Sequence, residues 1–291
     1  MITKQELSWT LGHSDSSQTL PEKWVPATVP GAVNLDIAKA ENYEPWWYGQ
    51  NWKNFLWMED KFWTYETKFE RPQLAADQQV RFISKGIDYA YEIFLNGESI
   101  YTYEGMFKPV DLDLTEKLAD KNTLRILIQP APKRHNDRNH RSQADNCCKP
   151  AVSYGWDWHP RLIPLGIWDD TWPEIRPCAR LDEVNVQYWL NDSRESADIV
   201  LSAKVENAQG QPYTWTLLAP DGSIALQKEG LIEDDLEIAT RLDGIQLWWP
   251  HTHGTPHLYR SCLTLGSSDA QLDKHSCDIG FRTVELVMAE G

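Results

Sequence analysis

The feature that most limits how this chain folds is a series of short apolar segments separated by turn residues. Between Lys61 and Gln129 the sequence is rich in Val, Ile, Phe and Tyr, and turn-forming residues interrupt it at short intervals. Segments of this length and composition are typical of antiparallel β-strands. Strands are therefore expected at residues 62–69, 80–85, 89–95 and 123–128.

The clearest local signal is the pair Asn96-Gly97, which follows the expected strand at 89–95. A type I′ turn needs positive φ at both central residues, and Asn-Gly meets that need, so a hairpin returning through residues 99–103 is predicted. Helical patterns are sparse and are expected only at residues 32–40 and 115–119. Short, evenly spaced strands with few helices indicate an all-β sandwich or jelly roll.

A domain boundary is expected close to Cys178, where two prolines punctuate the chain. A new series of strands begins beyond it, at residues 184–190 and 199–205. Turns are expected at Ala208-Gln209-Gly210 and at Pro220-Asp221-Gly222. Residues 179–291 have about the length of an immunoglobulin-like sandwich, although the immunoglobulin spacing of Cys, Trp and Cys is missing. The predicted domains are therefore 1–178 and 179–291.

Charge and hydropathy exclude several partners. With 28 basic and 43 acidic residues the net charge is −15, which opposes binding to nucleic acid or anionic lipid. No segment approaches the about 18 consecutive apolar residues of a membrane-spanning helix, and the first residues lack the apolar core of a signal peptide. Neither a membrane partner nor a signal peptide is predicted, and the compartment, cytoplasmic or periplasmic, is left open. A basic cluster is interpreted as a solvated loop, and consists of Lys133-Arg134-His135, Arg138, His140 and Arg141.

Cysteine and histidine patterns give no metal site. The five cysteines form neither a disulfide framework nor a C-x-x-C pair, and most are interpreted as buried thiols. His251, His253 and His257 lie around Gly254 and Pro256, which favours a turn over a ligand cluster. We expect no metal and no cofactor.

The main candidate site is the run Tyr154-Gly155-Trp156-Asp157-Trp158-His159-Pro160-Arg161, closely followed by Leu165-Gly166-Ile167-Trp168. It places two indoles around one carboxylate. A pyranose stacks its C–H face on an indole, while its hydroxyls need an acceptor that takes two hydrogen bonds. The alternative is that both tryptophans belong to the core and Asp157 caps a turn. The total of 15 tryptophans is compatible with either use.

Four ordered groups of residues extend along the chain. They are Val29-Pro30-Gly31-Ala32-Val33-Asn34 with Trp46-Trp47-Tyr48-Gly49-Gln50-Asn51; Gly86-Ile87-Asp88-Tyr89-Ala90 with Leu95-Asn96-Gly97; Gly155-Trp156-Asp157-Trp158 with Gly166-Ile167-Trp168; and Leu247-Trp248-Trp249-Pro250 with Gly280-Phe281-Arg282-Thr283. In these groups the chain resembles the non-catalytic front half of glycoside hydrolase family 2, most closely its β-mannosidase branch. The resemblance covers nearly the whole length. It implies a galactose-binding-like jelly roll followed by an immunoglobulin-like sandwich.

The resemblance also implies what this sequence lacks. Family members are retaining glycosidases whose two catalytic glutamates lie in a (β/α)₈ barrel after the Gly-Phe-Arg-Thr marker, with the acid/base usually in an Asn-Glu pair. The sequence has no Asn-Glu pair, and a barrel needs about 200 further residues, expected after residue 291. Retention requires two carboxyl groups about 5 Å apart across the sugar, and no motif supplies them. We therefore expect no catalytic residue here, and a non-catalytic N-terminal fragment of an exo-β-glycosidase that is inactive alone.

In such enzymes the W-D-W loop reaches the mouth of the barrel and helps to bind the terminal sugar. The resemblance thus assigns Asp157 as acceptor for sugar hydroxyls, and Trp156 or Trp158 as part of the apolar wall. His159 stands where the family usually has glycine, so it would narrow the pocket or contact the substrate. The implied partners are a terminal β-linked sugar and the C-terminal barrel of the same polypeptide.

Several alternatives stay open. Asp169-Asp170-Thr171 replaces the more common Arg-Pro, and mannosidase, galactosidase, glucuronidase and exo-glucosaminidase activities share this architecture. Arg161 is expected to pair with a nearby acid, and Lys149 either serves the structure or reaches the same cleft. The competing functions are a stand-alone carbohydrate-binding module and a purely structural or protein-interaction sandwich, in which all the aromatic clusters belong to the core.

Overall fold

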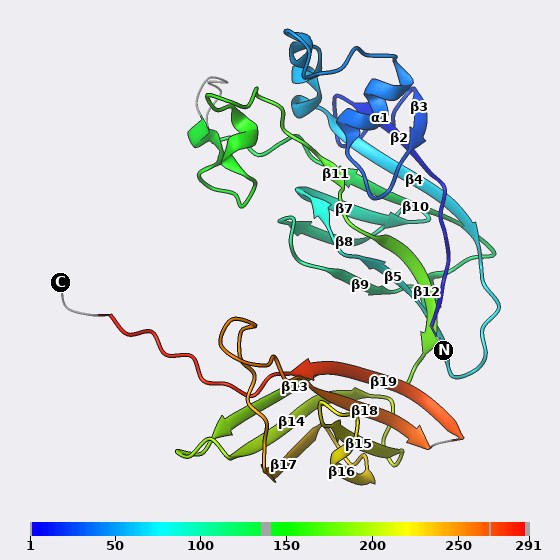
Figure 1. The fold of residues 1–291 in the computed structure, drawn as a ribbon. Coiled ribbons are helices and arrows are strands. Elements are labelled where there is room, and N and C mark those ends of the chain that lie inside the picture. Colours follow the sequence, from blue (N-terminus) through cyan, green and yellow to red (C-terminus); the bar gives the residue numbers. More distant parts are fainter. Residues whose placement is uncertain (1, 135–140, 268, 289–291) are drawn as a thin grey trace. The chain divides into compact units, whose positions relative to one another are not determined.

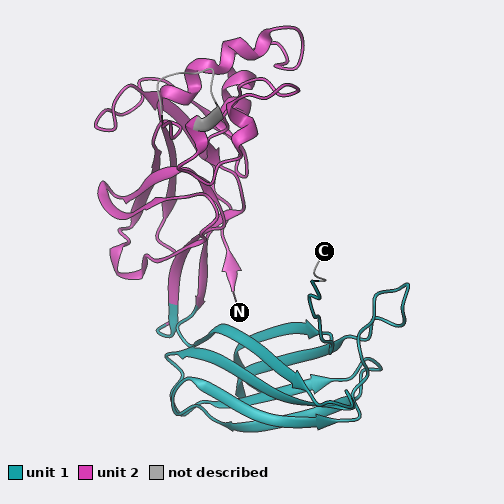
Figure 2. Cartoon of the chain, turned by 90° about the vertical axis from the view of Figure 1, so that its left-hand side faces the viewer, with its two compact units in different colours: residues 1, 76–78, 177–291 teal, residues 2–75, 79–176 magenta. Residues whose placement is uncertain are grey.

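The computed structural model describes residues 2–134, 141–267 and 269–288, and the chain forms two compact units (Figure 2). The first, here called the jelly-roll unit, comprises Ile2–Ala75 and Gln79–Arg176. The second, the sandwich unit, comprises Ala76–Gln78 and the chain from Pro177 onward. Within the described residues, no helix is long and apolar enough to cross a membrane.

The jelly-roll unit contains two main antiparallel sheets (Figure 1). The larger has the order β3 (Trp24–Ala27), β2 (Trp9–Ser14), β4 (Phe62–Glu70), β10 (Lys121–Ile128), β7 (Ala90–Leu95), β8 (Glu98–Glu104). The smaller has the order β1 (Thr3–Lys4), β12 (Thr171–Pro177), β5 (Gln78–Ser84), β9 (Val110–Asp113). A short pair joins β11 (Gly166–Ile167) to β6 (Ile87–Asp88).

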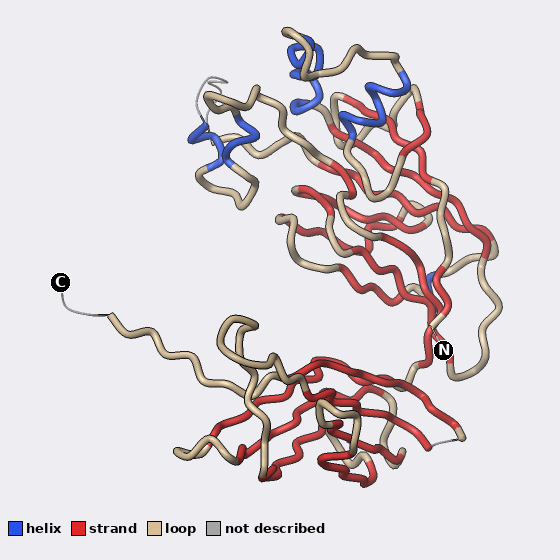
Figure 3. The backbone as a smooth tube through the Cα atoms, in the orientation of Figure 1, coloured by secondary structure: helices blue, strands red, loops and turns tan. Residues whose placement is uncertain are grey.

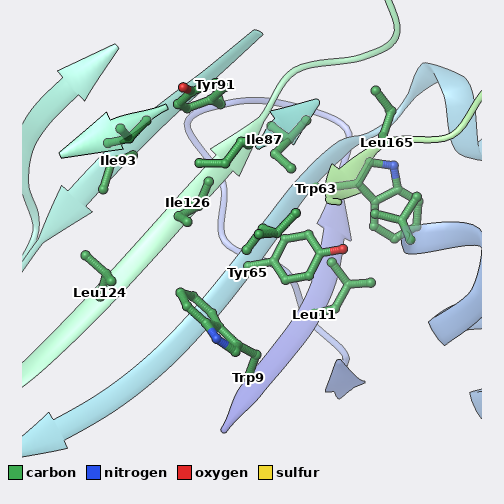
Figure 4. Packing of buried hydrophobic residues seen from close by; sticks show 14 of the residues in the cluster. Trp9, Leu11, Trp63, Tyr65, Ile87, Tyr91, Ile93, Leu124, Ile126 and Leu165 are labelled. Carbon is green, nitrogen blue, oxygen red and sulfur yellow. The ribbon is translucent and has the colours of Figure 1, made fainter. Parts of the chain in front are cut away.

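The core of this unit lies against the middle of the larger sheet (Figure 4). In the pairing register, Ile126 of β10 is opposite both Tyr65 of β4 and Ile93 of β7, and all three side chains are buried. Trp63 is fully buried as well, and its indole donates a hydrogen bond of 2.9 Å to the Met58 carbonyl. Each such side chain contributes about 1.5–3 kcal/mol by leaving water.

The predicted hairpin is confirmed. Asn96 and Gly97 have φ of 53° and 88° and connect β7 to β8, as a turn with positive φ at both positions requires. The Asn96 side chain donates a hydrogen bond of 3.0 Å to Asn122, the residue before Thr123 on the neighbouring strand β10. The strongest short-range signal of the sequence therefore fixes the edge of the larger sheet.

The expected strands are present with small shifts at their ends, whereas the helical segments were underestimated. The expected helices are α1 (Val33–Ala40) and the short 3₁₀ helix η2 (Thr115–Lys117). Three further 3₁₀ segments were not expected, namely η1 (Asn51–Asp60), η3 (Arg141–Ala144) and η4 (Ala151–Tyr154) (Figure 3). A 3₁₀ helix has three residues per turn and is short, so it leaves no apolar repeat of 3.6 residues in the sequence.

The sandwich unit consists of a three-stranded and a four-stranded antiparallel sheet. The three-stranded sheet has the order β13 (Arg180–Leu190), β14 (Ser196–Glu206), β17 (Leu236–Asp243). The four-stranded sheet has the order β16 (Ile224–Leu231), β15 (Pro212–Leu218), β18 (Tyr259–Ser267), β19 (Ala270–Ile279). Trp215, Leu263 and Phe281 are buried in its core, and the Trp215 indole donates a 2.9 Å hydrogen bond to Ser261. The two expected turns, around Gly210 and Gly222, join β14 to β15 and β15 to β16.

The interpretation of the cysteines as buried thiols was wrong. Cys148 is exposed, and the other four are only partly buried. On β18, for example, Cys262 lies between the buried residues Ser261 and Leu263, so strand alternation turns its thiol to the outer side of the sheet.

Two loops predicted from the sequence lie wholly or partly within the described residues. The histidine-rich segment is a turn, in which the His253 N–H donates to the Pro250 carbonyl at 2.8 Å. In the basic cluster, Lys133 forms ion pairs with Glu59 and Asp60, and Arg134 pairs with Asp145. His135, Arg138 and His140 lie outside the described residues.

Candidate functional site

Two long connections leave the sheets of the jelly-roll unit. Residues 41–61 lead from α1 to β4 and contain η1, and residues 129–165 lead from β10 to β11 and contain η3 and η4. Figure 3 shows most of the helical turns of this unit gathered in and around these connections.

Both connections contribute to one hollow of about 430 Å³. Its lining residues are Trp46, Trp47, Gly49 and Trp52 from the first connection and Trp156, Asp157, Trp158, His159 and Pro160 from the second. All four residues expected at a sugar site thus lie around the same space. The volume is within the range of about 300–1,000 Å³ that is usual for small-molecule pockets.

Residues 156–159 form a tight hairpin. The Trp156 N–H donates to the His159 carbonyl at 2.9 Å, and the His159 N–H donates to the Trp156 carbonyl at 3.2 Å. Asp157 and Trp158 are therefore held at the tip of a two-residue turn. Gly155 enters this turn with φ of 109°, a conformation that strains any residue with a Cβ atom.

The exposure of the tryptophans excludes the alternative that they are core residues. Trp156 is 42% exposed and Trp158 is 74% exposed. Trp158 lies in the two-residue turn itself, and Trp156 is one of the two paired residues that flank it.

Asp157 is exposed as well, and none of the described residues forms a hydrogen bond or ion pair with its carboxylate. The idea that it caps a turn has no hydrogen bond to support it. An ionised carboxylate accepts hydrogen bonds with both oxygens. Its acceptor capacity is therefore available to a ligand in the hollow.

His159 joins the aromatic residues of the two connections. Its ring centroid lies 6.0 Å from Trp158 in an edge-on arrangement and 6.3 Å from Trp46. Trp46 in turn meets Trp47 edge-on at 5.6 Å. The imidazole Nδ1 lies 2.6 Å from the Pro160 carbonyl oxygen, which fixes the plane of the ring. His159 therefore lies among the aromatic residues that line the hollow.

A buried ion pair holds the two connections together. Arg161 donates from Nε and Nη2 to the two carboxylate oxygens of Glu59, both at 2.9 Å, and both side chains are almost inaccessible. Arg161 also donates to the Tyr154 carbonyl at 3.4 Å. Because Glu59 belongs to η1, this bidentate contact fixes the hairpin relative to the tryptophans of the first connection. The expected pairing of Arg161 with an acid is confirmed.

Lys149 does not reach the hollow, so that alternative is corrected. Its side chain is fully buried, and its ammonium donates to Asp88 Oδ1 at 2.6 Å and to the Pro164 carbonyl at 2.7 Å. Burial raises the pKa of Asp88 and lowers the pKa of Lys149, while the charge of each partner opposes the shift of the other. This ion pair fixes the chain just before the hairpin to β6.

The tryptophans of the first connection were not recognised as site residues from the sequence. In the sequence, Trp46 and Trp47 were noted only as part of a group of residues typical of the family. In the structure, Trp47 is 70% exposed and lines the hollow. The available signal was the density of aromatic residues in Trp46-Trp47-Tyr48-Gly49-Gln50-Asn51-Trp52. In the described part of the chain, no group of three or more His, Cys, Asp or Glu side chains is arranged to hold a metal ion.

Comparison with family models gives two matches. Residues 9–169 match the model described as glycosyl hydrolase 2 galactose-binding domain-like, and residues 179–282 match the model described as glycosyl hydrolases family 2. Curated relatives include β-mannosidase B of Aspergillus oryzae, 27% identical over 305 residues, and of Neosartorya fischeri, 28% identical over 291 residues. These alignments cover 98% and 94% of this chain but 36% and 34% of the relatives. The chain thus spans about a third of the length of the curated relatives it matches.

Solved structures with the same arrangement of strands include β-D-mannosidase from Dictyoglomus thermophilum. The TM-score is 0.79 with 25% sequence identity, and the match covers 98% of this chain and 37% of that one. A β-glucuronidase from an uncultured Clostridium species matches with a TM-score of 0.65 and 16% identity, over 99% of this chain and 45% of that one. These matches confirm the expected fold class, a galactose-binding-like jelly roll followed by an immunoglobulin-like sandwich.

Proposed function

The chain belongs to glycoside hydrolase family 2, and we propose that it supplies the substrate-binding hairpin of an exo-β-glycosidase whose catalytic residues lie elsewhere in the polypeptide. The expected resemblance is thereby confirmed, and the matched domains make up the non-catalytic region of such an enzyme. The proposed domain limits are 1–178 and 179–291. The proposed intramolecular partner is a catalytic barrel, which the share of about one third of the relatives' length supports.

The observation that carries this proposal is the carboxylate of Asp157 at the tip of the hairpin, exposed between Trp156 and Trp158. Two hydroxyls of a pyranose can donate to the two carboxylate oxygens, while a C–H face of the ring stacks on an indole. These contacts fix the position and orientation of the sugar. Fixing a substrate relative to catalytic groups lowers the entropic part of the activation barrier.

For the sugar we propose a terminal β-linked mannose. The support is that the curated relatives named above are β-mannosidases, as is the solved structure with 25% identity. His159 narrows the hollow beside Trp158 and contributes a polar ring edge, so it is a candidate for discriminating between epimers. The β-glucuronidase match supports the fold alone.

The test is the variant Asp157→Ala in the natural polypeptide that carries these residues. We expect a fall of about 30-fold in kcat/KM on aryl β-mannoside, equal to about 2 kcal/mol of transition-state stabilisation. Asp192→Ala, which removes an exposed carboxylate from the sandwich unit, is the matched control and should change nothing. Unchanged efficiency of Asp157→Ala would contradict the proposal.

The same assay separates the competing function. A panel of aryl mannoside, galactoside, glucuronide and glucosaminide identifies the sugar when one of them is hydrolysed. Binding of a sugar without hydrolysis of any substrate would replace the proposal with a carbohydrate-binding module, which the exposed tryptophans of the hairpin also fit.

A further inference from the structure

We infer that the hollow binds two consecutive rings of the substrate, with Trp46, Trp47 and Trp52 forming a wall for the pyranose that follows the terminal sugar. This inference rests on the proposed function, since the terminal sugar is assigned to the hairpin at Asp157. The wall, defined as these three tryptophans, belongs to the connection between α1 and β4 and is separate in sequence from the hairpin.

The number of indoles exceeds what one sugar can use. Five tryptophans line the hollow, together with a single carboxylate. A pyranose has two faces and therefore stacks on at most two aromatic rings. The hairpin alone supplies two indoles and the carboxylate, which is a complete set for one ring. The three tryptophans of the wall are left for another group.

The wall is held in place although its outermost member is exposed. Trp47 is 70% exposed, and it packs edge-on against Trp46, which contacts the hydrophobic core of the unit. The backbone around it is fixed, because the Tyr48 N–H and the Asn51 side chain both donate to the Pro45 carbonyl at 3.1 Å. Exposed aromatic surface that the fold keeps in one position is typical of a binding surface.

The polar groups of the hollow are unevenly placed. The carboxylate of Asp157 belongs to the hairpin, whereas the first connection contributes only the wall and Gly49, none of which carries a charge. The terminal sugar can therefore be recognised by its hydroxyls, and the second ring by a C–H face alone. Such a subsite demands an apolar face but tolerates variation in the hydroxyls. The β-linkage matters because it leaves successive pyranoses extended with their faces available.

The test is isothermal titration of the natural polypeptide with two ligands that cannot be hydrolysed, methyl β-thiomannoside and the S-linked β-1,4-mannobiose. We expect the disaccharide to bind about tenfold more tightly, which is the size of one additional aromatic stacking contact. Trp47→Ala should remove most of this advantage and leave the Kd of the methyl glycoside within about twofold. Trp47 is exposed, so the variant is expected to fold. Trp189→Ala removes a tryptophan that is 56% exposed on the sandwich unit and is the matched control.

The other possible outcomes separate a failure of this inference from a failure of the proposed function. Equal weakening of both ligands by Trp47→Ala would mean that Trp47 acts on the terminal sugar, and no change would mean that the wall binds nothing. An advantage that appears for p-nitrophenyl β-thiomannoside but not for the disaccharide would assign the wall to an aromatic leaving group instead. If Asp157→Ala has no effect while the Trp47-dependent preference is present, the proposed role of the hairpin fails and the second subsite stands. Absence of binding by both ligands would overturn both.

Discussion

Two irregular connections in this chain each carry a pair of tryptophans, and they are built in different ways. In the jelly-roll unit, Trp156 and Trp158 flank an exposed carboxylate on a hairpin that buried ion pairs hold. In the sandwich unit, Trp248 and Trp249 lie between β17 and β18, and residues 244–258 are held by backbone hydrogen bonds, such as that from the Trp248 N–H to the Phe281 carbonyl at 2.9 Å.

The surroundings of the second pair differ in charge as well. The Arg282 guanidinium lies over the Trp248 ring at 4.6 Å, and a hollow of about 230 Å³ nearby includes Arg194 and Arg282 in its lining but no carboxylate. Guanidinium groups donate hydrogen bonds and accept none. The two pairs of tryptophans therefore differ in the groups beside them, because the hairpin places a carboxylate next to exposed indoles and the lining of the sandwich hollow contains guanidinium groups instead.

The largest loss of stability is expected for a substitution of Lys149. Lys149→Met leaves the Asp88 carboxylate buried without its cation, and loss of one partner from a buried ion pair costs about 3–5 kcal/mol. We expect the free energy of unfolding of the jelly-roll unit to fall by that amount. Hydrogen exchange followed peptide by peptide through a urea titration distinguishes the two units.

The double variant Asp88→Asn, Lys149→Met provides the control. It removes both charges and should recover a large part of the lost stability. A loss below about 1 kcal/mol for Lys149→Met alone would mean that the hairpin segment does not depend on its buried pair, and the contrast between the two connections would disappear.

A smaller effect is expected at the corresponding place in the sandwich unit. Arg282→Met removes the cation from the face of Trp248, and an exposed contact of this kind contributes about 0.5–1 kcal/mol. The same exchange experiment should show this loss in sandwich peptides only. A destabilisation as large as that of Lys149→Met would show that a surface cation can stabilise a connection as well as a buried pair does.

The smallest expected effect is the loss of stability at low pH. Burial raises the pKa of Asp111, but hydrogen bonds and charge from Arg81 and Arg176 outweigh this effect, so the pKa of Asp111 lies below its ordinary value. In the sandwich unit, the hydrogen bond from Arg260 lowers the pKa of Asp278. A depressed pKa in the folded state gives stability that is present above the ordinary carboxyl pKa of about 4 and is lost as the pH falls through the folded value.

Both units should thus lose stability from about pH 5 downward, and the jelly-roll unit should lose more, because Asp111 is the less exposed of the two carboxylates. The difference in unfolding free energy between the wild type and Asp111→Asn is expected to shrink between pH 7 and pH 3. Asp278→Asn, at a solvent-screened pair, should show little change over the same range. A larger pH response for Asp278→Asn would reverse this order.

Local rules of the sequence predicted much of the fold and the centre of the candidate site. Asn96-Gly97 fixed a hairpin because its two residues accept positive φ, and the predicted strands appear where short segments rich in Val, Ile, Phe and Tyr between turn residues indicated them. The residues from Trp156 to His159 could also be found from the sequence, because they are consecutive and a short turn brings them together.

The remaining parts of the site depend on contacts between residues that are distant in sequence. Arg161 was expected to pair with an acid, but its partner Glu59 lies 102 positions away, and Asp88 lies 61 positions from Lys149. No periodicity in the sequence marks η1, and no local pattern indicated that Trp46 and Trp47 line the same hollow as the hairpin. Exposure was likewise hidden, because an isolated tryptophan is equally suited to a core and to a binding surface.

The sequence by itself determined the all-β class, the hairpin turns and the cluster of two indoles and a carboxylate, because these depend on dihedral preferences and on residues that are neighbours along the chain. Only the tertiary structure decided that the indoles are exposed, that Lys149 is buried against Asp88 and that Trp46, Trp47 and Trp52 line the same hollow as Asp157. These features depend on which connections the sheets bring side by side. Packing and the desolvation of charge, which act between distant parts of the chain, select that arrangement.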